Sequence, residues 1–304
     1  MASSQSRKRR TEGQQRRNFG RPFAFGMVMV LAFALVYTFA FTETSYWTPG
    51  DNEIIVAFLD VGQGDSILIW SRDSAILIDG GDTNRGNVVL EYLRLAGVSR
   101  LDYVIATHPH RDHIGGLVTV LGRVEVGQVL MPDVVHTTTA FENLLAVIEN
   151  NDIPVVIPGV GQGFRAGIID FTVLGPLPGH RNLNDASIVL RLVHGETSFL
   201  FTGDVEAAGE RALMASGQDL SADVLKLGHH GSRTSSTAAF LDAVSPMAAV
   251  ITAGAGNQFG HPHGEVLVRL YERGIMVYRT DLIGTVVMAS DGDRIVLLHK
   301  RNGD

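Results

Sequence analysis

The sequence predicts an α/β protein in which two β-sheets pack face to face between outer layers of helices, a four-layer αββα sandwich. Three observations favour this fold. The 304 residues are 45% hydrophobic, which is enough to bury a sizeable core. From Ile54 onward, short β-rich segments alternate with segments of helical periodicity. The strands also gather in two sets, the pattern expected of two packed sheets with helices outside.

Each predicted strand is a short apolar run bounded by turn-forming residues, and each predicted helix has apolar residues on one face. In chain order, the strands are expected at residues 54–60, 66–70, 75–81, 101–107, 168–176, 187–195, 197–204, 223–228, 248–254, 276–280, 284–290 and 294–299. The helices are expected at residues 86–97, 141–151, 205–216, 239–245 and 264–274. Strand 101–107 is almost continuously apolar, so we expect it to be buried on both faces.

The first fifty residues predict a membrane anchor. Residues 1–22 hold seven basic residues and one acid, and residues 23–41 are uncharged and apolar. As a helix the apolar run is about 28 Å long, close to the roughly 30 Å hydrocarbon core of a bilayer. We expect a cytoplasmic tail, one transmembrane signal anchor at 23–41, a linker at 42–53 with Trp47 at the membrane interface, and a domain at 54–300 outside the cytoplasm. A buried core helix and a cleaved signal peptide are the alternatives.

Charge and cysteine content limit the function. Seven of the 25 basic residues and one of the 32 acidic residues lie in the tail, so the rest of the chain carries 18 basic and 31 acidic residues, a formal charge of −13. This charge excludes a global electrostatic attraction for a polyanion. Cysteine is absent, which excludes disulfides and thiolate metal ligands and leaves His, Asp and Glu as the strong ligands.

Three histidines and a carboxylate crowd the segment 107–116, THPHRDHIGG. The proline after the first histidine ends the preceding strand, so these side chains are expected on the loop that leaves it. The spacing suits two neighbouring cations, one held by His108 and His110 and the other by Asp112 and His113. Two cations about 3.5–4 Å apart can polarise an ester and supply a nucleophile from water at neutral pH.

Other strand ends supply the missing ligands. Asp204 follows an apolar run, where its carboxylate would bridge two metals, and His229 and His230 follow another strand. Asp79 also ends a strand, which suits an acceptor that orients a ligating histidine. The alternative for Asp79 is a turn-forming residue before two glycines.

These segments resemble a known family. HPHRDH resembles the H-x-H-x-D-H signature of the metallo-β-lactamase superfamily, whose fold is an αββα sandwich with a dinuclear metal centre at the sheet edge. Six further segments resemble, in order, motifs of the extracellular metallo-β-lactamase-like domain of ComEC-type DNA-uptake proteins: FLDVGQGDSILI, NDASIVLRL, FLFTGD, DVLKLGHHGSRTSST, GNQFGHP and RTDLIGTV. The resemblance covers about residues 54–298. ComEC proteins have many membrane spans and this chain one, so the channel role is not implied.

The resemblance implies the first ligand cluster, a bridging carboxylate and a last histidine, carried here by His108, His110, Asp112, His113, Asp204 and either His229 or His230. Many members have a further ligating histidine before the bridging carboxylate, but LNDASIVL has none. One metal is then less completely coordinated by protein, which leaves room for water or a phosphate beside Asn184 or Asp185.

Other positions are implied to meet the substrate. His261 resembles a family position near the site and would protonate a leaving oxygen or hold a phosphate; a turn histidine is the alternative. Asp112 and His261 are thus the catalytic candidates. Ser232 and Arg233, beside the histidine pair, would contact an anionic substrate, although ordinary surface loop residues are an equal alternative.

The implied function is hydrolysis that depends on two divalent metal ions, zinc or manganese. The implied substrate is a phosphodiester such as single-stranded DNA, cleaved by a nuclease domain anchored in the cell membrane by a single pass. One alternative is hydrolysis of a small ester or of a cell-envelope phosphoester, as by a phosphorylcholine esterase. Another, of a different class, is a non-catalytic surface-binding module.

Overall fold

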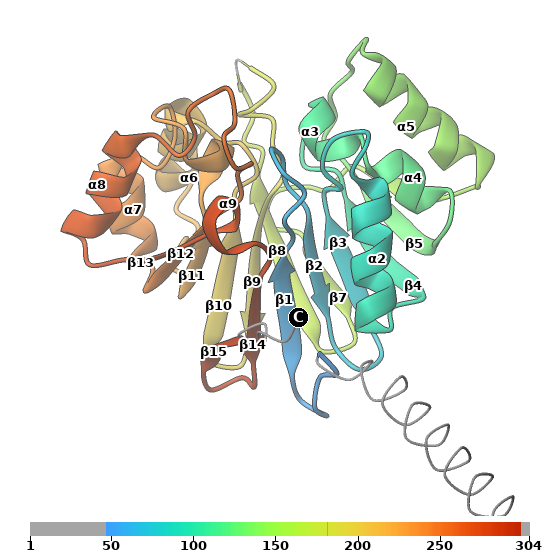
Figure 1. Ribbon diagram of the computed structural model, residues 1–304. Helices are drawn as coiled ribbons and strands as arrows, with labels where there is room; N and C mark the ends of the chain where they lie inside the picture. The colour runs from blue at the N-terminus through green and yellow to red at the C-terminus, as the bar shows by residue number, and fades with distance from the viewer. Residues whose placement is uncertain (1–46, 181, 299–304) are drawn as a thin grey trace, which may run out of the picture. The chain divides into compact units, whose positions relative to one another are not determined.

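The structure is a computed structural model that describes residues 47–180 and 182–298, drawn as a ribbon in Figure 1. In this part of the chain eight strands form one sheet, in the order β15–β14–β1–β2–β3–β4–β5–β6. Neighbours are antiparallel from β15 to β3 and parallel from β3 to β6. The strands are β1 (Ile54–Phe58), β2 (Ile67–Trp70), β3 (Ala75–Ile78), β4 (Arg100–Ile105), β5 (Glu125–Leu130), β6 (Val155–Val156), β14 (Val286–Ser290) and β15 (Ile295–Leu298).

The second sheet of the described chain has seven strands, in the order β13–β12–β11–β10–β9–β8–β7. Its neighbours are parallel from β13 to β10 and antiparallel from β10 to β7. The strands are β7 (Gly163–Ala166), β8 (Ile169–Gly175), β9 (Val189–His194), β10 (Thr197–Phe201), β11 (Val224–Lys226), β12 (Ala248–Ile251) and β13 (Met276–Arg279).

Helices cover the outer faces of both sheets. In Figure 1, α2, α4 and α5 lie outside the first sheet, and α6, α7 and α8 lie outside the second. The α-helices are α2 (Gly86–Ala96), α3 (Arg111–Ile114), α4 (Leu117–Leu121), α5 (Thr139–Asn150), α6 (Ala207–Ala215), α7 (Ala238–Val244), α8 (Gly264–Glu272) and α9 (Thr280–Ile283). A 3₁₀ turn, η2, spans Gly228–Gly231.

The strands are apolar on both faces because both faces are covered. Along β1, Ile54, Val56 and Phe58 belong to the core between the two sheets, whereas Ile55 and Ala57 face the helices of the first sheet. This alternation is the period of two that a pleated strand imposes on its side chains. The four layers therefore enclose three apolar cores, one between the sheets and one under each set of helices.

The mixed α/β fold with two packed sheets, predicted from the sequence, is confirmed. Three strands were missed, β5, β6 and β7. In β5 only the last two residues are buried, and a glutamate and a glycine interrupt the apolar run. The strand β6 has two residues, too short to show any periodicity. Pairing with a neighbour, rather than local hydrophobicity, places these segments in the sheets.

The predicted tail and anchor, residues 1–41, and the first part of the predicted linker, 42–46, lie outside the described residues. Within 47–180 and 182–298, none of the helices combines the length and the hydrophobicity of a membrane span. Trp47, which is predicted to lie at the membrane interface, packs on the domain. Its ring centroid lies 6.4 Å from that of Trp70 and 6.1 Å from that of Tyr92, and Trp70 Nε1 donates to its carbonyl oxygen at 3.1 Å.

We expect Phe201→Ala to destabilise the protein through the core between the sheets. Phe201 is 2% exposed, and its ring centroid lies 6.1 Å from that of Phe58 on the facing sheet. Truncation of such a ring should lower the free energy of unfolding by about 3–5 kcal/mol. Chemical denaturation followed by circular dichroism measures the change. Tyr271→Ala is the matched control, because Tyr271 is 84% exposed; equal losses in the two variants would contradict the assigned core.

Candidate metal centre

The candidate metal centre lies where each sheet changes from antiparallel to parallel pairing. The change occurs at β3 in the first sheet and at β10 in the second. Loops that leave the carboxyl ends of strands at such a point diverge and open a crevice. The loop after β3 carries Asp79, and the loop after β10 carries Asp204. The loops after β4 and β11 carry the segment 107–116 and the pair His229 and His230.

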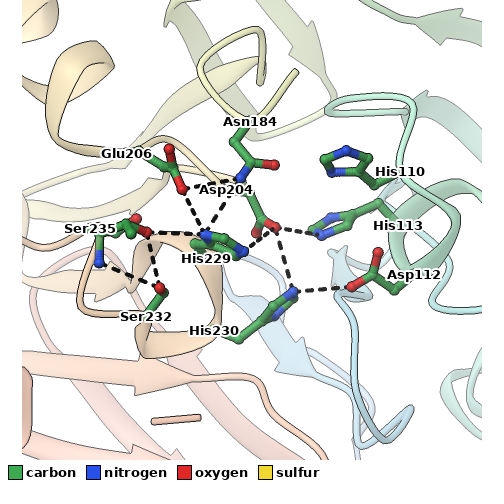
Figure 2. A network of polar contacts seen from close by, with 12 residues as sticks. His110, Asp112, His113, Asn184, Asp204, Glu206, His229, His230, Ser232 and Ser235 are labelled. Carbon is green, nitrogen blue, oxygen red and sulfur yellow. Dashed lines mark hydrogen bonds and ion pairs between the residues drawn. The ribbon is translucent and has the colours of Figure 1, made fainter. Parts of the chain in front are cut away.

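Asp204 is shared by two groups of potential ligands. Its Oδ2 lies 3.2 Å from His113 Nε2 and 3.6 Å from His230 Nε2. The same oxygen lies 3.8 Å from Nε2 of His108, which in turn is 2.9 Å from Nδ1 of His110. Figure 2 shows His113 and His230 pointing toward Asp204. The carboxylate of Asp204 thus lies where it would act as a ligand together with either group of imidazoles.

A fourth donor for the group around His230 is either Asp65 or Asp112. Asp65 lies close to His113, Asp204 and His230, but its Oδ2 forms an ion pair with Lys226 and its Oδ1 accepts from a threonine hydroxyl. Asp112 Oδ2 lies 3.4 Å from His230 Nε2, and its side chain is about a third exposed. We therefore assign Asp112 as the ligand, because the oxygens of Asp65 already have partners.

Two of the histidines are held through Nδ1, which leaves Nε2 for a metal. Asp79 Oδ2 accepts from His113 Nδ1 at 2.8 Å, the contact expected of a carboxylate that orients a ligand. Thr107 fixes Asp79 in turn, donating to it from both its backbone N–H and its hydroxyl. His108 Nδ1 lies 3.1 Å from the Thr107 hydroxyl and 3.3 Å from that of Ser187.

A buried lysine stands behind His230. His230 Nδ1 donates to the carbonyl oxygen of Thr252 at 2.9 Å and lies 3.2 Å from Asp65 Oδ1. Lys226 is 1% exposed; its Nζ pairs with Asp65 and donates to the carbonyl oxygen of Gly203 at 3.1 Å. Gly203 precedes Asp204, so this ammonium group links Asp65, which lies beside His230, to the loop that carries Asp204.

Both members of the histidine pair face the centre. His229 and His230 have φ angles of 49° and 54°, a left-handed conformation that costs a non-glycine residue about 1–2 kcal/mol. With both residues turned in this way, His229 Nε2 also approaches Asp204 Oδ2, at 3.9 Å. His229 Nδ1 lies 3.2 Å from Glu206 Oε1. Strain of this kind persists where a site requires it.

Unsatisfied atoms test whether these residues fit a metal. His113 Nε2, His230 Nε2 and Asp204 Oδ1 are buried and have no hydrogen-bond partner among the residues that the structure describes. Such atoms are costly to bury, and a cation would satisfy all three. Imidazole nitrogens and carboxylate oxygens suit zinc, manganese or iron. The residues present therefore fit a divalent metal.

Carboxylates and histidines adjust one another's protonation. Burial opposes the charged form of His230, yet Asp204 and Asp65 raise its pKa to about 9. For His113, burial is likewise outweighed by Asp204 and Asp79, and its pKa lies well above the usual value. Burial would raise the pKa of Asp204, but the positive charges of His113 and His230 hold it well below the usual value. Before a cation binds, protons on two imidazoles thus balance the carboxylates.

His108 and His110 differ from that pair. Burial and the nearby positive charge of His113 lower the pKa of His108 well below its ordinary value. The same two causes lower the pKa of His110. Both imidazoles are therefore neutral near pH 7, which is the form that binds a metal.

The predicted substrate residues Asn184 and Asp185 lie on one loop but have different surroundings. Asn184 Nδ2 donates to Glu206 Oε1 at 3.3 Å, and its Oδ1 is buried without a hydrogen-bond partner in the described chain. Asp185 Oδ1 accepts from the backbone N–H groups of Glu206 and Gly209, at 2.9 and 3.1 Å. Asn184 therefore borders the centre, whereas Asp185 satisfies backbone groups at the start of α6.

Ser232 and Arg233 follow the histidine pair. Ser232 is 4% exposed, and its hydroxyl pairs with that of Thr234 at 2.9 Å. Arg233 is more than half exposed and lies 3.6 Å from a carboxylate oxygen of Glu265. Ser232 thus stabilises the local loop structure, whereas the guanidinium of Arg233 lies at the surface.

His261 lies beside the centre. Its ring centroid is 5.5 Å from that of His229 and 6.2 Å from that of His230. Burial, followed by the positive charge of His230, lowers the pKa of His261 to about 4. The side chain is neutral near pH 7, which favours the predicted phosphate contact over the predicted proton donor.

Sequence reasoning missed Asp65, Lys226 and Glu206. Asp65 belongs to the segment FLDVGQGDSILI, which contributed to the family resemblance, but no role in the site was predicted for this residue. A Cβ on Gly64 would collide with the carbonyl oxygen of Asp112, so this glycine allows Asp65 to pack against the ligand loop. For Lys226 the available signal was a charged residue inside an apolar strand, because a buried lysine needs a partner.

Fold and site together define a metal-binding α/β sandwich protein. The chain belongs to the metallo-beta-lactamase superfamily, whose model matches residues 59–254. It is 32% identical over 250 residues to ComE operon protein 3 of Bacillus subtilis, covering 76% of this chain and 32% of that protein. It is 35% identical over 240 residues to competence protein ComA of Neisseria gonorrhoeae, covering 78% of this chain and 32% of the relative. The predicted resemblance to ComEC-type competence proteins is confirmed.

A solved structure shares the fold. Igni18, a metallo hydrolase from Ignicoccus hospitalis, superposes with a TM-score of 0.52 at 13% identity, over 77% of this chain and 98% of that one. At this identity the likeness concerns the fold alone. The chain spans about a third of the length of the two curated relatives.

Removing either orienting carboxylate should weaken metal binding while the ligands stay in place. We expect Asp65→Asn and Asp79→Asn each to reduce metal affinity about 10- to 100-fold, because the imidazole that each carboxylate holds loses its fixed orientation. Competition with a chromogenic chelator measures the affinity. Asp73→Asn, at an exposed carboxylate, is the control. An unchanged affinity in both variants would contradict the assigned roles.

Metal binding should release protons and strengthen as the pH rises. At pH 7 His230 lies below its pKa of about 9 and is protonated, so a cation must displace that proton. Calorimetric titration in buffers of different ionisation enthalpy should show at least one proton released, with the number falling as the pH passes 9. Release of none at pH 7 would mean that the cation binds elsewhere.

Proposed function

We propose that this chain is a metal-dependent hydrolase that cleaves phosphodiester bonds, with single-stranded DNA as its substrate and two divalent cations, zinc or manganese, as its cofactors. Its membership of the superfamily and its histidine and carboxylate cluster support a metal-dependent hydrolase. The observation that carries the proposal is the convergence on Asp204 of the unsatisfied Nε2 atoms of His113 and His230, which come from different sheets.

The chain's residues would hold the two cations side by side. His108, His110 and Asp204 form one group. His113, Asp204 and His230 belong to the other, with Asp112 assigned as its fourth donor. When bound, the cations would polarise the phosphoryl group and activate water. The protein's part is to fix the ligands: Asp79 orients His113, and Asp65, supported by Lys226, orients His230.

Two further side chains would meet the phosphoryl oxygens. His261 is neutral near pH 7 and has a buried Nδ1 without a hydrogen-bond partner in the described chain, so it would bind an oxygen rather than deliver a proton. Asn184 lies where many superfamily members are expected to have one more ligating histidine. Its amide would occupy that side of the centre, and its buried Oδ1 has no other partner within the described residues.

The relatives and the predicted anchor support this choice of substrate. One relative is named a competence protein, and the ComEC-type proteins that the chain resembles take up DNA. We propose that the anchor predicted at 23–41 holds the domain outside the cytoplasm, where such a strand arrives. Protease digestion of spheroplasts tests this orientation, because a domain inside the cytoplasm would be protected.

A substrate panel tests the reaction. Purified protein loaded with manganese or zinc would be given single-stranded DNA, bis(p-nitrophenyl) phosphate, a phosphorylcholine ester and a lactone. Cleavage of the first two supports the proposal. Cleavage restricted to phosphorylcholine or to the lactone would replace it with the alternative hydrolases, and cleavage of none would leave a binding module.

Loss of a ligand should abolish activity and leave the fold intact. We expect His108→Ala and Asp204→Ala each to lower kcat/KM by about 100-fold or more, since a direct ligand matters at least as much as its orienting partner. Circular dichroism checks folding. The matched controls are His180→Ala and Asp73→Ala, at exposed positions outside both ligand groups. Full activity in a well-folded Asp204→Ala variant would refute the bridging role.

A further inference from the structure

A groove opens beside the metal centre. It has a volume of about 910 Å³, and metal-site residues His110 and Asp112 form part of its lining. One wall comes from the loop after β12, with Asn257, Gln258 and Phe259, and the other from the residues that lead into α5, 136–140. A ligand in this groove would therefore lie against two of the proposed metal ligands.

Phe259 presents an unusual surface at the groove. The side chain is 53% exposed, although a phenylalanine normally avoids water. His261 stacks on it, with ring centroids 5.6 Å apart and planes at 23°. One face of the phenyl ring is thus backed by protein, while its exposed part borders the groove. This arrangement matches an aromatic platform on which another flat ring stacks.

The loop that carries Phe259 is tied down. Asn257 Nδ2 donates to the carbonyl oxygens of Gly254 and His261, at 2.9 and 2.6 Å. Its Oδ1 accepts from the backbone N–H groups of Phe259 and His261, at 3.2 and 3.0 Å. One asparagine therefore spans the loop, so the ring is held in place before a ligand arrives, which lowers the entropic cost of binding.

The opposite wall is polar. Thr137, Thr138 and Thr139 line the groove where the twelve-residue helix α5 begins. Hydroxyls and the first N–H groups of a helix suit phosphate oxygens. Within the groove, Arg111 forms an ion pair with Asp82 at 3.0 Å, so the charge of its guanidinium is balanced locally. An aromatic wall facing a hydroxyl wall, with metal ligands between them, matches the base, phosphate and cleavage point of a nucleotide strand.

We propose that Phe259 is a stacking platform for an unpaired nucleobase adjacent to the phosphodiester that is cleaved. The groove is then a subsite selective for single strands. In a duplex each base already stacks on its neighbours and has no free face to offer. Stacking also supplies affinity in a domain whose net charge is unfavourable for a polyanion. This inference rests on the proposed phosphodiesterase function.

The test compares two strands that differ only in their bases. Full-length protein would be assayed on an oligothymidylate and on an abasic strand of the same length and backbone. We expect Phe259→Ala to lower kcat/KM for the oligothymidylate by about 5- to 100-fold, the equivalent of one lost stacking contact, and to leave the abasic strand within about twofold. Phe259→Trp keeps an aromatic ring at this position and should retain the preference for the oligothymidylate over the abasic strand. Tyr271→Ala, at an exposed aromatic outside the groove, should leave that preference unchanged.

Two results would overturn the inference while the proposed function stands. Equal losses on both strands would mean that Phe259 only supports the loop, and no loss on either would mean that no base reaches it. If wild-type protein cleaves neither strand, the proposed function fails. The stacking platform is then tested separately by strand binding, measured as fluorescence anisotropy. Tighter binding of the oligothymidylate than of the abasic strand, lost in Phe259→Ala, would support the stacking platform. Equal binding of the two strands would contradict it.

Discussion

The carboxylate of Asp204 is 2% exposed, in a place where an unmatched negative charge is costly. Imidazole nitrogens from His108, His113 and His230 come within 3.8 Å of its Oδ2. They arrive on loops from different sheets, and neither sheet alone supplies the full set. The charge of Asp204 is therefore balanced only when the two sheets pack together. The core between the sheets thus stabilises both the fold and the site.

Backbone hydrogen bonds also connect the loops around the metal centre to one another. Asp65 N–H donates to the carbonyl oxygen of Asp112 at 3.1 Å, and Gly80 N–H donates to that of His113 at 2.7 Å. The loops with the orienting carboxylates are thus bonded to the loop with the ligands. A Cβ on Gly116 would collide with the carbonyl oxygen of Gly80, so these loops approach as closely as backbones can. The ligands are held rigidly because their supports cannot move independently.

The sequence allowed prediction of the two-sheet fold and of the segments that meet at the centre, because strands and their polar ends are local patterns. It did not reveal Asp65 and Lys226, whose roles depend on which loops meet across the sheets. The sequence also did not show whether His229 or His230 faces the metal centre, for a different reason. In a regular backbone, adjacent side chains diverge, but two successive left-handed residues bring both imidazoles toward Asp204. That conformation depends on the surrounding tertiary structure, which residue spacing along the chain does not reveal.

Under the proposed function, a chain whose residues 23–304 carry a formal charge of −13 must still attract a phosphodiester, and the buried lysine contributes to this attraction. Lys226 neutralises Asp65, so that carboxylate orients His230 without adding net negative charge to the centre. The proposed pair of divalent cations would then face Asp112 and Asp204, with neutral imidazoles completing the set. With both cations bound, positive charge would exceed negative charge in that part of the crevice, and screening by salt would confine the attraction to the phosphate being cleaved. Recognition of the rest of the strand then falls to uncharged contacts, as a stacking platform would provide.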